Sequence, residues 1–201
     1  MKIIGITGGV GCGKSEVIRY IMKNYNCYVI FADDVAKQLQ QKGNLCYDRI
    51  VQLLGTEILT TDGEIDKVKM AAKIFATGEL LEKVNGIIHP AVFDYVTEKI
   101  AEYEEKDETD FFIIEAALLI ECGYGKIVDE MWYVYTKDEI RRERLKQNRG
   151  YSDEKIDQIF SSQLSYEEFV NASSFVIDNN NTVEDAQKQI DIKLEEYLCQ
   201  K

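Results

Sequence analysis

Residues 8–15, GGVGCGKS, have the residue types and the spacing of a phosphate-binding loop. Glycines lack a Cβ and adopt positive φ freely, so consecutive main-chain N–H groups can turn inward around an anion. Lys14 adds a compact cation for the phosphates, and the Ser15 hydroxyl is a ligand that Mg²⁺ accepts. The pattern predicts a site for a nucleoside triphosphate with Mg²⁺. The residues expected to bind the nucleotide are Gly9, Val10, Gly11, Cys12, Gly13, Lys14 and Ser15.

The segments on both sides of this loop agree with that prediction. Residues 2–7 (KIIGIT) are an apolar run that stops at glycines and predicts a strand, and residues 14–25 have helical spacing of apolar side chains. Strand, loop and helix in this order are the context that a phosphate loop requires. The alternative is an ordinary glycine-rich turn, and we expect the full pattern by chance in roughly one of a hundred chains of this length.

Acidic residues follow two more predicted strands, at residues 27–32 and 111–115. Asp33 and Asp34 come directly after the first, and Glu115 ends the second. The carboxyl ends of parallel strands share one edge of a sheet, where ligands bind. One of the two aspartates can take a proton from a substrate hydroxyl, and Glu115 can hold a Mg²⁺-bound water. Helix capping and a solvent-facing strand end are the structural alternatives.

Four arginines and one histidine are further candidates for functional residues. Four arginines lie on or just after a charged predicted helix at residues 137–148: Arg141, Arg142, Arg144 and Arg149. Arginines over a nucleotide stabilise the charge that develops in phosphate transfer, whereas a solvated helix face would pair them with Glu139 and Glu143. We expect Arg144 to be functional, followed by Arg149. His89 stands before Pro90, which fits the first position of a helix, so His89 alone predicts a cap or a packed residue.

The whole chain alternates between predicted strands and helices, which favours an α/β fold with a mostly parallel sheet covered on both faces. The predicted strands are residues 2–7, 27–32, 111–115, 131–136 and 174–178. The predicted helices are residues 14–25, 33–54 with a break near Gly43, 66–76, 79–88, 91–105, 137–148, 152–161 and 183–197. The helical stretch from about 33 to 103 is longer than one crossover needs, which indicates an insertion that covers a ligand.

Composition limits the class of protein. The chain has 201 residues, 45% of them hydrophobic, and a net charge of −12. This acidity argues against a protein that coats nucleic acid or an anionic membrane. Five cysteines with wide spacing and no C-x-x-C indicate free thiols in a reducing compartment. We expect no signal peptide and no membrane span, and therefore a cytoplasmic protein.

These residues together resemble the dephospho-CoA kinase family through nearly the whole chain. The segments that carry the resemblance are ITGGVGCGKS, IFADDVAKQ, IHP, IIEAALLIECG, RLKQNRGYS and VIDNN. The resemblance implies phosphorylation of the ribose 3′-hydroxyl of dephospho-CoA by ATP, which gives coenzyme A. It also implies a single three-layer P-loop kinase domain over residues 1–201, with a helical substrate region at about 33–110 and a short lid at about 140–165.

The resemblance also implies roles for individual residues. Asp33 is the expected base, and the other expected catalytic residues are Lys14, Arg144 and Arg149. Glu121 and Asn179 join the nucleotide site, and Ser15 with Glu115 organises Mg²⁺. The acceptor is expected to contact Asp33, His89 and Leu118.

The chain departs from the family pattern at several positions. Phe31, Ala117 and Asn148 stand where the family usually has Asp, Pro and the first residue of an Arg-Asp-Gly lid. Two other functions therefore stay open: a nucleoside or nucleotide kinase, and a nucleotide-binding regulatory protein without transfer activity. The sequence contains no N-K-x-D segment, the pattern that reads guanine in GTPases, so a GTPase is not expected. We expect a monomer or a weak homo-oligomer.

Overall fold

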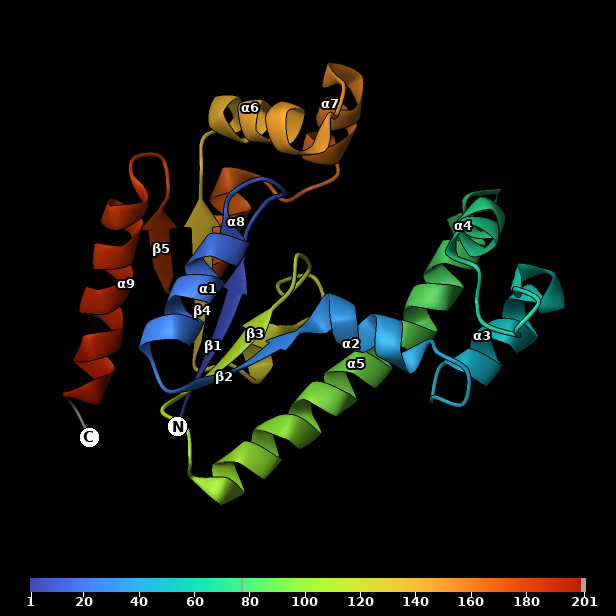
Figure 1. Cartoon of the computed structure of the whole chain (residues 1–201), viewed down its shortest axis with the longest axis horizontal. Coiled ribbons are helices and arrows are strands. Elements are labelled where there is room, and N and C mark those ends of the chain that lie inside the picture. Colours follow the sequence, from blue (N-terminus) through green and yellow to red (C-terminus); the bar gives the residue numbers. More distant parts are fainter. Residues whose placement is uncertain (77, 200–201) are drawn as a thin grey trace. The chain divides into compact units, whose positions relative to one another are not determined.

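The computed structural model describes residues 1–76 and 78–199 and contains a parallel β-sheet (Figure 1). In the described residues its strands lie in the order β2-β3-β1-β4-β5. β1 pairs in parallel with β3 and β4, and β4 pairs in parallel with β5. The strands are β1 (Lys2–Thr7), β2 (Cys27–Phe31), β3 (Phe111–Glu115), β4 (Glu130–Tyr135) and β5 (Phe175–Asp178).

Continuous apolar runs form the central strands because a sheet covered on both faces buries every residue. The side chains of Ile4 and Ile6 in β1 have no exposed surface, and the same is true of Phe112, Ile113 and Ile114 in β3. All five predicted strands are present, with ends that differ from the predictions by no more than one residue. The carboxyl ends of β1 and β3 lie next to each other, since Ile6 pairs with Glu115.

The chain divides into two units, Met1–Ile30 with Tyr103–Lys201, and Phe31–Glu102. The first unit holds the sheet with α1 (Lys14–Asn24), η2 (Tyr124–Lys126), α6 (Asp138–Arg149), α7 (Asp153–Ser161), α8 (Tyr166–Ala172) and α9 (Val183–Leu198). α1 and α9 pack together, and α8 packs on β4, where the Phe169 and Tyr133 rings stack with centroids 4.6 Å apart.

The second unit is helical. It contains α2 (Ala32–Leu39), α3 (Tyr47–Leu54), η1 (Thr56–Ile58), α4 (Lys67–Ala76) and most of α5 (Gly78–Lys106). The predicted break near Gly43 is confirmed, because residues 40–46 separate α2 from α3. That this unit binds a substrate, and that residues 140–165 act as a lid, stay predictions.

The prediction of two helices separated at Pro90 was wrong. α5 continues through Pro90 from Gly78 to Lys106. A proline inside a helix removes one hydrogen bond and crowds the carbonyl four residues earlier, here that of Gly86. Buried apolar residues on both sides of the proline, Ile87, Ile88, Ala91 and Val92, keep the helix continuous by packing.

α8 was not predicted, although the sequence contains its start signal. Ser165 and Glu168 form a capping box: the Ser165 hydroxyl accepts from the Glu168 N–H, and the Glu168 carboxylate accepts from the Ser165 N–H. A serine followed three residues later by glutamate is the pattern of such a box.

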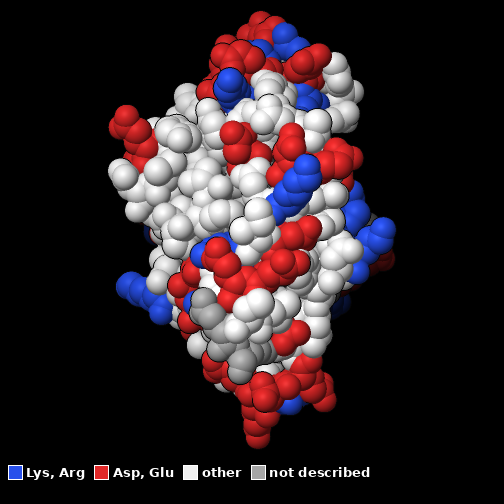
Figure 2. Space-filling model, turned by 90° about the vertical axis from the view of Figure 1, so that its left-hand side faces the viewer, with Lys and Arg blue, Asp and Glu red and all other residues white. Residues whose placement is uncertain are grey.

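The surface agrees with the acidic composition. Asp and Glu side chains cover more of the face in Figure 2 than Lys and Arg do. Among the described residues, no helix combines the length and the apolar character needed to cross a membrane.

Candidate functional site

Residues 8–13 form a glycine-rich turn between β1 and α1. Gly11 and Gly13 have φ of 85° and 96°, a conformation that side chains with a Cβ rarely adopt. Gly13 is the N-cap of α1 and provides no side-chain cap, so the first N–H groups of α1 are left for an anion. The loop therefore has the backbone geometry that its sequence predicts for phosphate binding.

Lys14, the first residue of α1, has its side chain folded back over this loop. Its Nζ donates a 2.7 Å hydrogen bond to the Gly8 carbonyl and lies 3.8 Å from Oε1 of Glu115 at the end of β3. The Lys14 and Glu115 side chains are only 12% and 17% exposed. A cation and a carboxylate thus meet at the carboxyl edge of β1 and β3, where the sequence predicts the ligand crevice.

The main-chain carbonyl of Cys12 fixes the other side of the loop, because three donors converge on it. Asn179 Nδ2 lies 2.8 Å away, Thr136 Oγ1 2.9 Å away and Arg144 Nη1 3.4 Å away. Thr136 and Asn179 follow the ends of β4 and β5, and both are buried. Strands far apart in the sequence therefore hold the conformation of the phosphate loop.

Of the predicted site residues outside the loop, Asn179 from the nucleotide set and Arg144 from the catalytic set are brought to it. Arg144 also donates to the Asn179 carbonyl at 3.4 Å. A Cβ on Gly13 would lie 2.3 Å from Asn179 Nδ2, so glycine at this position is also required by packing. Thr136 was not predicted as a site residue; its place at the end of a predicted strand was the available signal.

The other predicted arginine, Arg149, is the last residue of α6, and its described contact is with the Tyr151 ring, 6.0 Å from the centroid. The alternative, a solvated helix face on which the arginines pair with Glu139 and Glu143, is not found among the described ion pairs. Arg142 instead bridges to Asp153 and Asp157 of α7, because its side chain reaches the next helix.

Arg141 was not singled out from the arginine cluster, yet it lies against the phosphate loop. Its guanidinium is largely buried and donates a 3.0 Å hydrogen bond to the Val10 carbonyl. The sequence offers no separate signal for this contact, since all four arginines share one charged segment.

Glu121 and Leu118 lie in the turn that follows β3, and both are exposed. The Cys122 N–H donates to the Leu118 carbonyl at 2.9 Å, which stabilises the turn. Glu121 and Leu118 are thus placed near the carboxyl edge of the sheet by the chain itself, and their contacts with ligands stay predictions.

In the second unit, Asp33 lies in the first turn of α2, immediately after β2, and is exposed. The capping alternative was wrong, because the N-cap is Phe31. Asp34 is paired with Lys37 at 2.6 Å, which distinguishes the two neighbouring aspartates. His89 is half-buried within the continuous α5 rather than before a helix start.

Among the described residues, no group of three or more His, Cys, Asp or Glu side chains is placed to hold a metal ion by itself. Mg²⁺ at a phosphate-transfer site needs only one or two protein oxygens, with water and phosphate as its other ligands. The Ser15 hydroxyl and the Glu115 carboxylate are such oxygens. The donor set therefore fits Mg²⁺ that binds together with a nucleotide.

A central parallel strand followed by G-x-x-x-x-G-K-S and a helix defines a P-loop nucleotide-binding protein. Comparison with known proteins narrows this class. The sequence profile of the family described as dephospho-CoA kinase matches residues 2–185. The chain belongs to the dephospho-CoA kinase family, as its motifs predict.

Individual relatives agree with this family. A dephospho-CoA kinase from Carboxydothermus hydrogenoformans is 34% identical over 190 residues, which cover 94% of this chain and 91% of that protein. One from Streptococcus mutans is 37% identical over 194 residues, 96% of each chain. The solved structure of dephospho-CoA kinase from Campylobacter jejuni has the same fold, with a TM-score of 0.74, 22% identity and full coverage of both chains. The predicted α/β P-loop kinase fold is confirmed.

Proposed function

We propose that the loop at residues 8–15 binds the triphosphate of ATP and that Asp33 acts as the base toward the acceptor. Membership of the family makes the chain a kinase that phosphorylates dephospho-CoA with ATP to give coenzyme A. The observation that carries the proposal is the position of Lys14, held over the glycine loop between the Gly8 carbonyl and Glu115.

In the proposed binding step, the β- and γ-phosphates replace the Gly8 carbonyl as the partner of Lys14 Nζ. The loop amides and the uncapped start of α1 provide further donors. Ser15 and Glu115 are the residues that would hold Mg²⁺. When bound, the ion would neutralise phosphate charge. Asn179 and Glu121 complete the proposed nucleotide site, and Arg144 or Arg149 closes over the transferring phosphate.

In the proposed transfer step, the ribose 3′-hydroxyl oxygen of dephospho-CoA forms a bond with the γ-phosphorus, and the bond from that phosphorus to the β–γ bridging oxygen breaks. The hydroxyl proton passes to the Asp33 carboxylate, and ADP leaves with the bridging oxygen. Asp33 is preferred over Asp34 because Lys37 already pairs with Asp34. His89 and Leu118 are proposed to contact the acceptor.

We further propose that the chain works in the cytoplasm, as a monomer or a weak homo-oligomer. No observation favours either a nucleoside kinase or a regulatory protein without transfer activity over this assignment. The departures at Phe31, Ala117 and Asn148 leave Lys14, Ser15 and Asp33 in place.

The experiment is an ADP-release assay with ATP and Mg²⁺ and one of three acceptors: dephospho-CoA, adenosine or cytidine. We expect acceptor-dependent turnover with dephospho-CoA only, and a product heavier by one phosphate at the 3′ position. Asp33→Asn is expected to lower kcat by about 10²–10⁴-fold with little change in the KM for ATP. An unchanged kcat in Asp33→Asn, with Asp34→Asn as the matched control, would remove Asp33 from the mechanism.

A further inference from the structure

Arg141 makes a set of contacts that joins the phosphate loop to the segment after α6. Its Nε donates to the Val10 carbonyl at 3.0 Å, Nη1 donates to Asp138 Oδ1 at 2.8 Å, and Nη2 donates to Gln163 Oε1. The guanidinium carbon lies 4.2 Å from the centre of the Phe160 ring. Only 9% of the residue is exposed, so these partners replace water around the charge.

Gly9 leaves the space that this arginine occupies. A Cβ at Gly9 would lie 2.3 Å from Arg141 Nη2, and the φ of Gly9 is not in the positive region. This glycine is therefore needed for the approach of the guanidinium rather than for its backbone angle. The Arg141 guanidinium therefore lies directly against Gly9 and Val10 of the phosphate loop.

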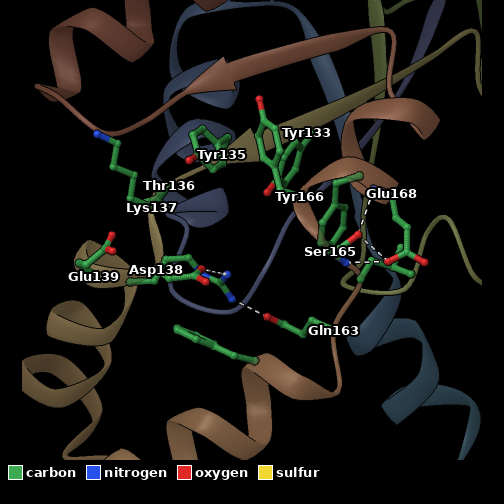
Figure 3. Close-up of a pocket in the computed structure, with 14 residues that line it drawn as sticks. Tyr133, Tyr135, Thr136, Lys137, Asp138, Glu139, Gln163, Ser165, Tyr166 and Glu168 are labelled. Carbon is green, nitrogen blue, oxygen red and sulfur yellow. Dashed lines mark hydrogen bonds and ion pairs between the residues drawn. The ribbon is translucent and has the colours of Figure 1, made fainter.

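The partners beyond the loop belong to another part of the fold. Phe160 is in α7 and Gln163 is in the connection from α7 to α8, both within the segment predicted as a lid. Figure 3 shows Asp138 and Gln163 reaching the same guanidinium from different sides, at the wall of a cavity of about 840 Å³. Tyr133, Tyr135 and Tyr166 are among the other residues that line this cavity. A single side chain thus contacts the loop, α6 and the α7–α8 connection.

We infer that Arg141 is a positioning residue, which holds the Val10 carbonyl toward α6 and couples the phosphate loop to Gln163. A planar guanidinium can serve three acceptors at once, whereas the ammonium of lysine cannot reproduce that fork. Without this hold, the loop spends part of its time in conformations that do not bind phosphate. The apparent Kd for nucleotide then rises by the inverse of the competent fraction. The inference rests on the proposed binding of ATP by this loop.

The first test compares Arg141→Met with Arg142→Met, the same substitution one residue further on the same helix, whose described partners are in α7. We expect Arg141→Met to raise the KM for ATP about tenfold, with kcat and the KM for dephospho-CoA within about twofold. Arg142→Met should keep the wild-type KM for ATP even where its Tm falls. The inference is overturned if Arg141→Met keeps the wild-type KM for ATP, or if both variants raise it equally.

The second test asks whether Gln163 acts through Arg141. Gln163→Leu leaves the bond to Val10 in place and should raise the KM for ATP less than Arg141→Met does. The double variant should match Arg141→Met alone, because residues in one network are not additive. If the increases in the KM for ATP of the two single variants multiply in the double variant, Gln163 does not act through Arg141. Arg141→Lys should not restore the wild-type KM for ATP.

Calorimetric titration of ADP into each variant separates this inference from the assignment of the acceptor. ADP binding needs no transfer, so the predicted weakening in Arg141→Met is measured even if dephospho-CoA is not phosphorylated. If the variants show the predicted differences in ADP affinity but the protein does not phosphorylate dephospho-CoA, only the assignment of the acceptor is contradicted. Equal ADP affinity in wild type and Arg141→Met would contradict the role of Arg141.

Discussion

The side-chain amide of Asn179 donates a 2.8 Å hydrogen bond to the main-chain carbonyl of Cys12. This bond joins the end of β5 to the phosphate loop, 167 residues apart in the sequence. Asn179 is only 7% exposed, and its amide lies where a Cβ on Gly13 would be. Asn179 therefore holds the conformation of the phosphate loop through the Cys12 carbonyl.

Asn179→Asp replaces this donor with a carboxylate of the same shape, which repels the Cys12 carbonyl. We expect the Kd for ATP to rise about tenfold, because an unsatisfied buried polar group costs about 1–3 kcal/mol. Fluorescence or calorimetric titration with ATP measures the change. Asn26→Asp is the matched control, since the Asn26 side-chain amide also donates to a main-chain carbonyl, that of Glu108, but on the surface and outside the phosphate loop. Wild-type affinity in Asn179→Asp would show that the loop does not depend on this bond.

Thr136→Val removes a hydroxyl that lies 2.9 Å from the Cys12 carbonyl and 3.2 Å from the Asn179 carbonyl. The free energy of unfolding should fall by about 1–2 kcal/mol, because both carbonyls stay buried with one partner fewer. Urea unfolding measures this loss. Thr136→Ser keeps the hydroxyl and loses only the methyl group, so its free energy of unfolding should fall clearly less. An unchanged free energy of unfolding in Thr136→Val would show that the hydroxyl does not stabilise this part of the fold.

The contact between α1 and α9 predicts a loss of stability at alkaline pH. Tyr20 and Tyr25 both donate to the Asp191 carboxylate, at distances of 2.6–2.8 Å. Burial first, and then the bond to Asp191, raises the pKa of Tyr20 to about 12. The fold thus favours the protonated phenol. Its contribution is complete below pH 10, the ordinary pKa of tyrosine, and is lost as the pH rises toward 12.

Tyr20→Phe should therefore lower the free energy of unfolding by about 1 kcal/mol at pH 7, the usual value of one hydrogen bond. The difference in the free energy of unfolding between wild type and Tyr20→Phe should shrink between pH 10 and 12. Tyr166→Phe, at an exposed tyrosine, is the control for a hydroxyl on the surface. A difference between wild type and Tyr20→Phe that stays constant up to pH 12 would contradict the titration of this contact.

The sequence was sufficient for those parts of the fold and site that local rules determine. The phosphate loop is recognisable because Gly11 and Gly13 are required by their own φ angles, and Lys14 follows at fixed spacing. The strands are recognisable because a buried parallel sheet needs runs such as those of β1 and β3. These signals lie within a few residues, so they do not depend on the rest of the chain.

The remaining features depend on contacts between distant segments. Arg141 and Arg144 are three residues apart on one charged helix, and only the packing of α6 shows that both reach the loop. Pro90 would end a helix by local rules, but buried neighbours keep α5 continuous. Thr136 becomes important only because β4 ends beside the phosphate loop. α8 is different, since its capping box of Ser165 and Glu168 is a local signal that lies within four residues of the sequence.

Transfer of the label from ATP carrying ³²P at its γ-phosphate to dephospho-CoA tests the central claim most directly. With wild type, we expect the label at the 3′ position of coenzyme A in step with ADP formation. Lys14→Met should lower the rate of transfer by about 10²-fold or more, because the cation on the transferring phosphate is lost. Two results would contradict the account. One is label that appears as inorganic phosphate at the same rate with and without dephospho-CoA. The other is a Lys14→Met variant that transfers the label at the wild-type rate.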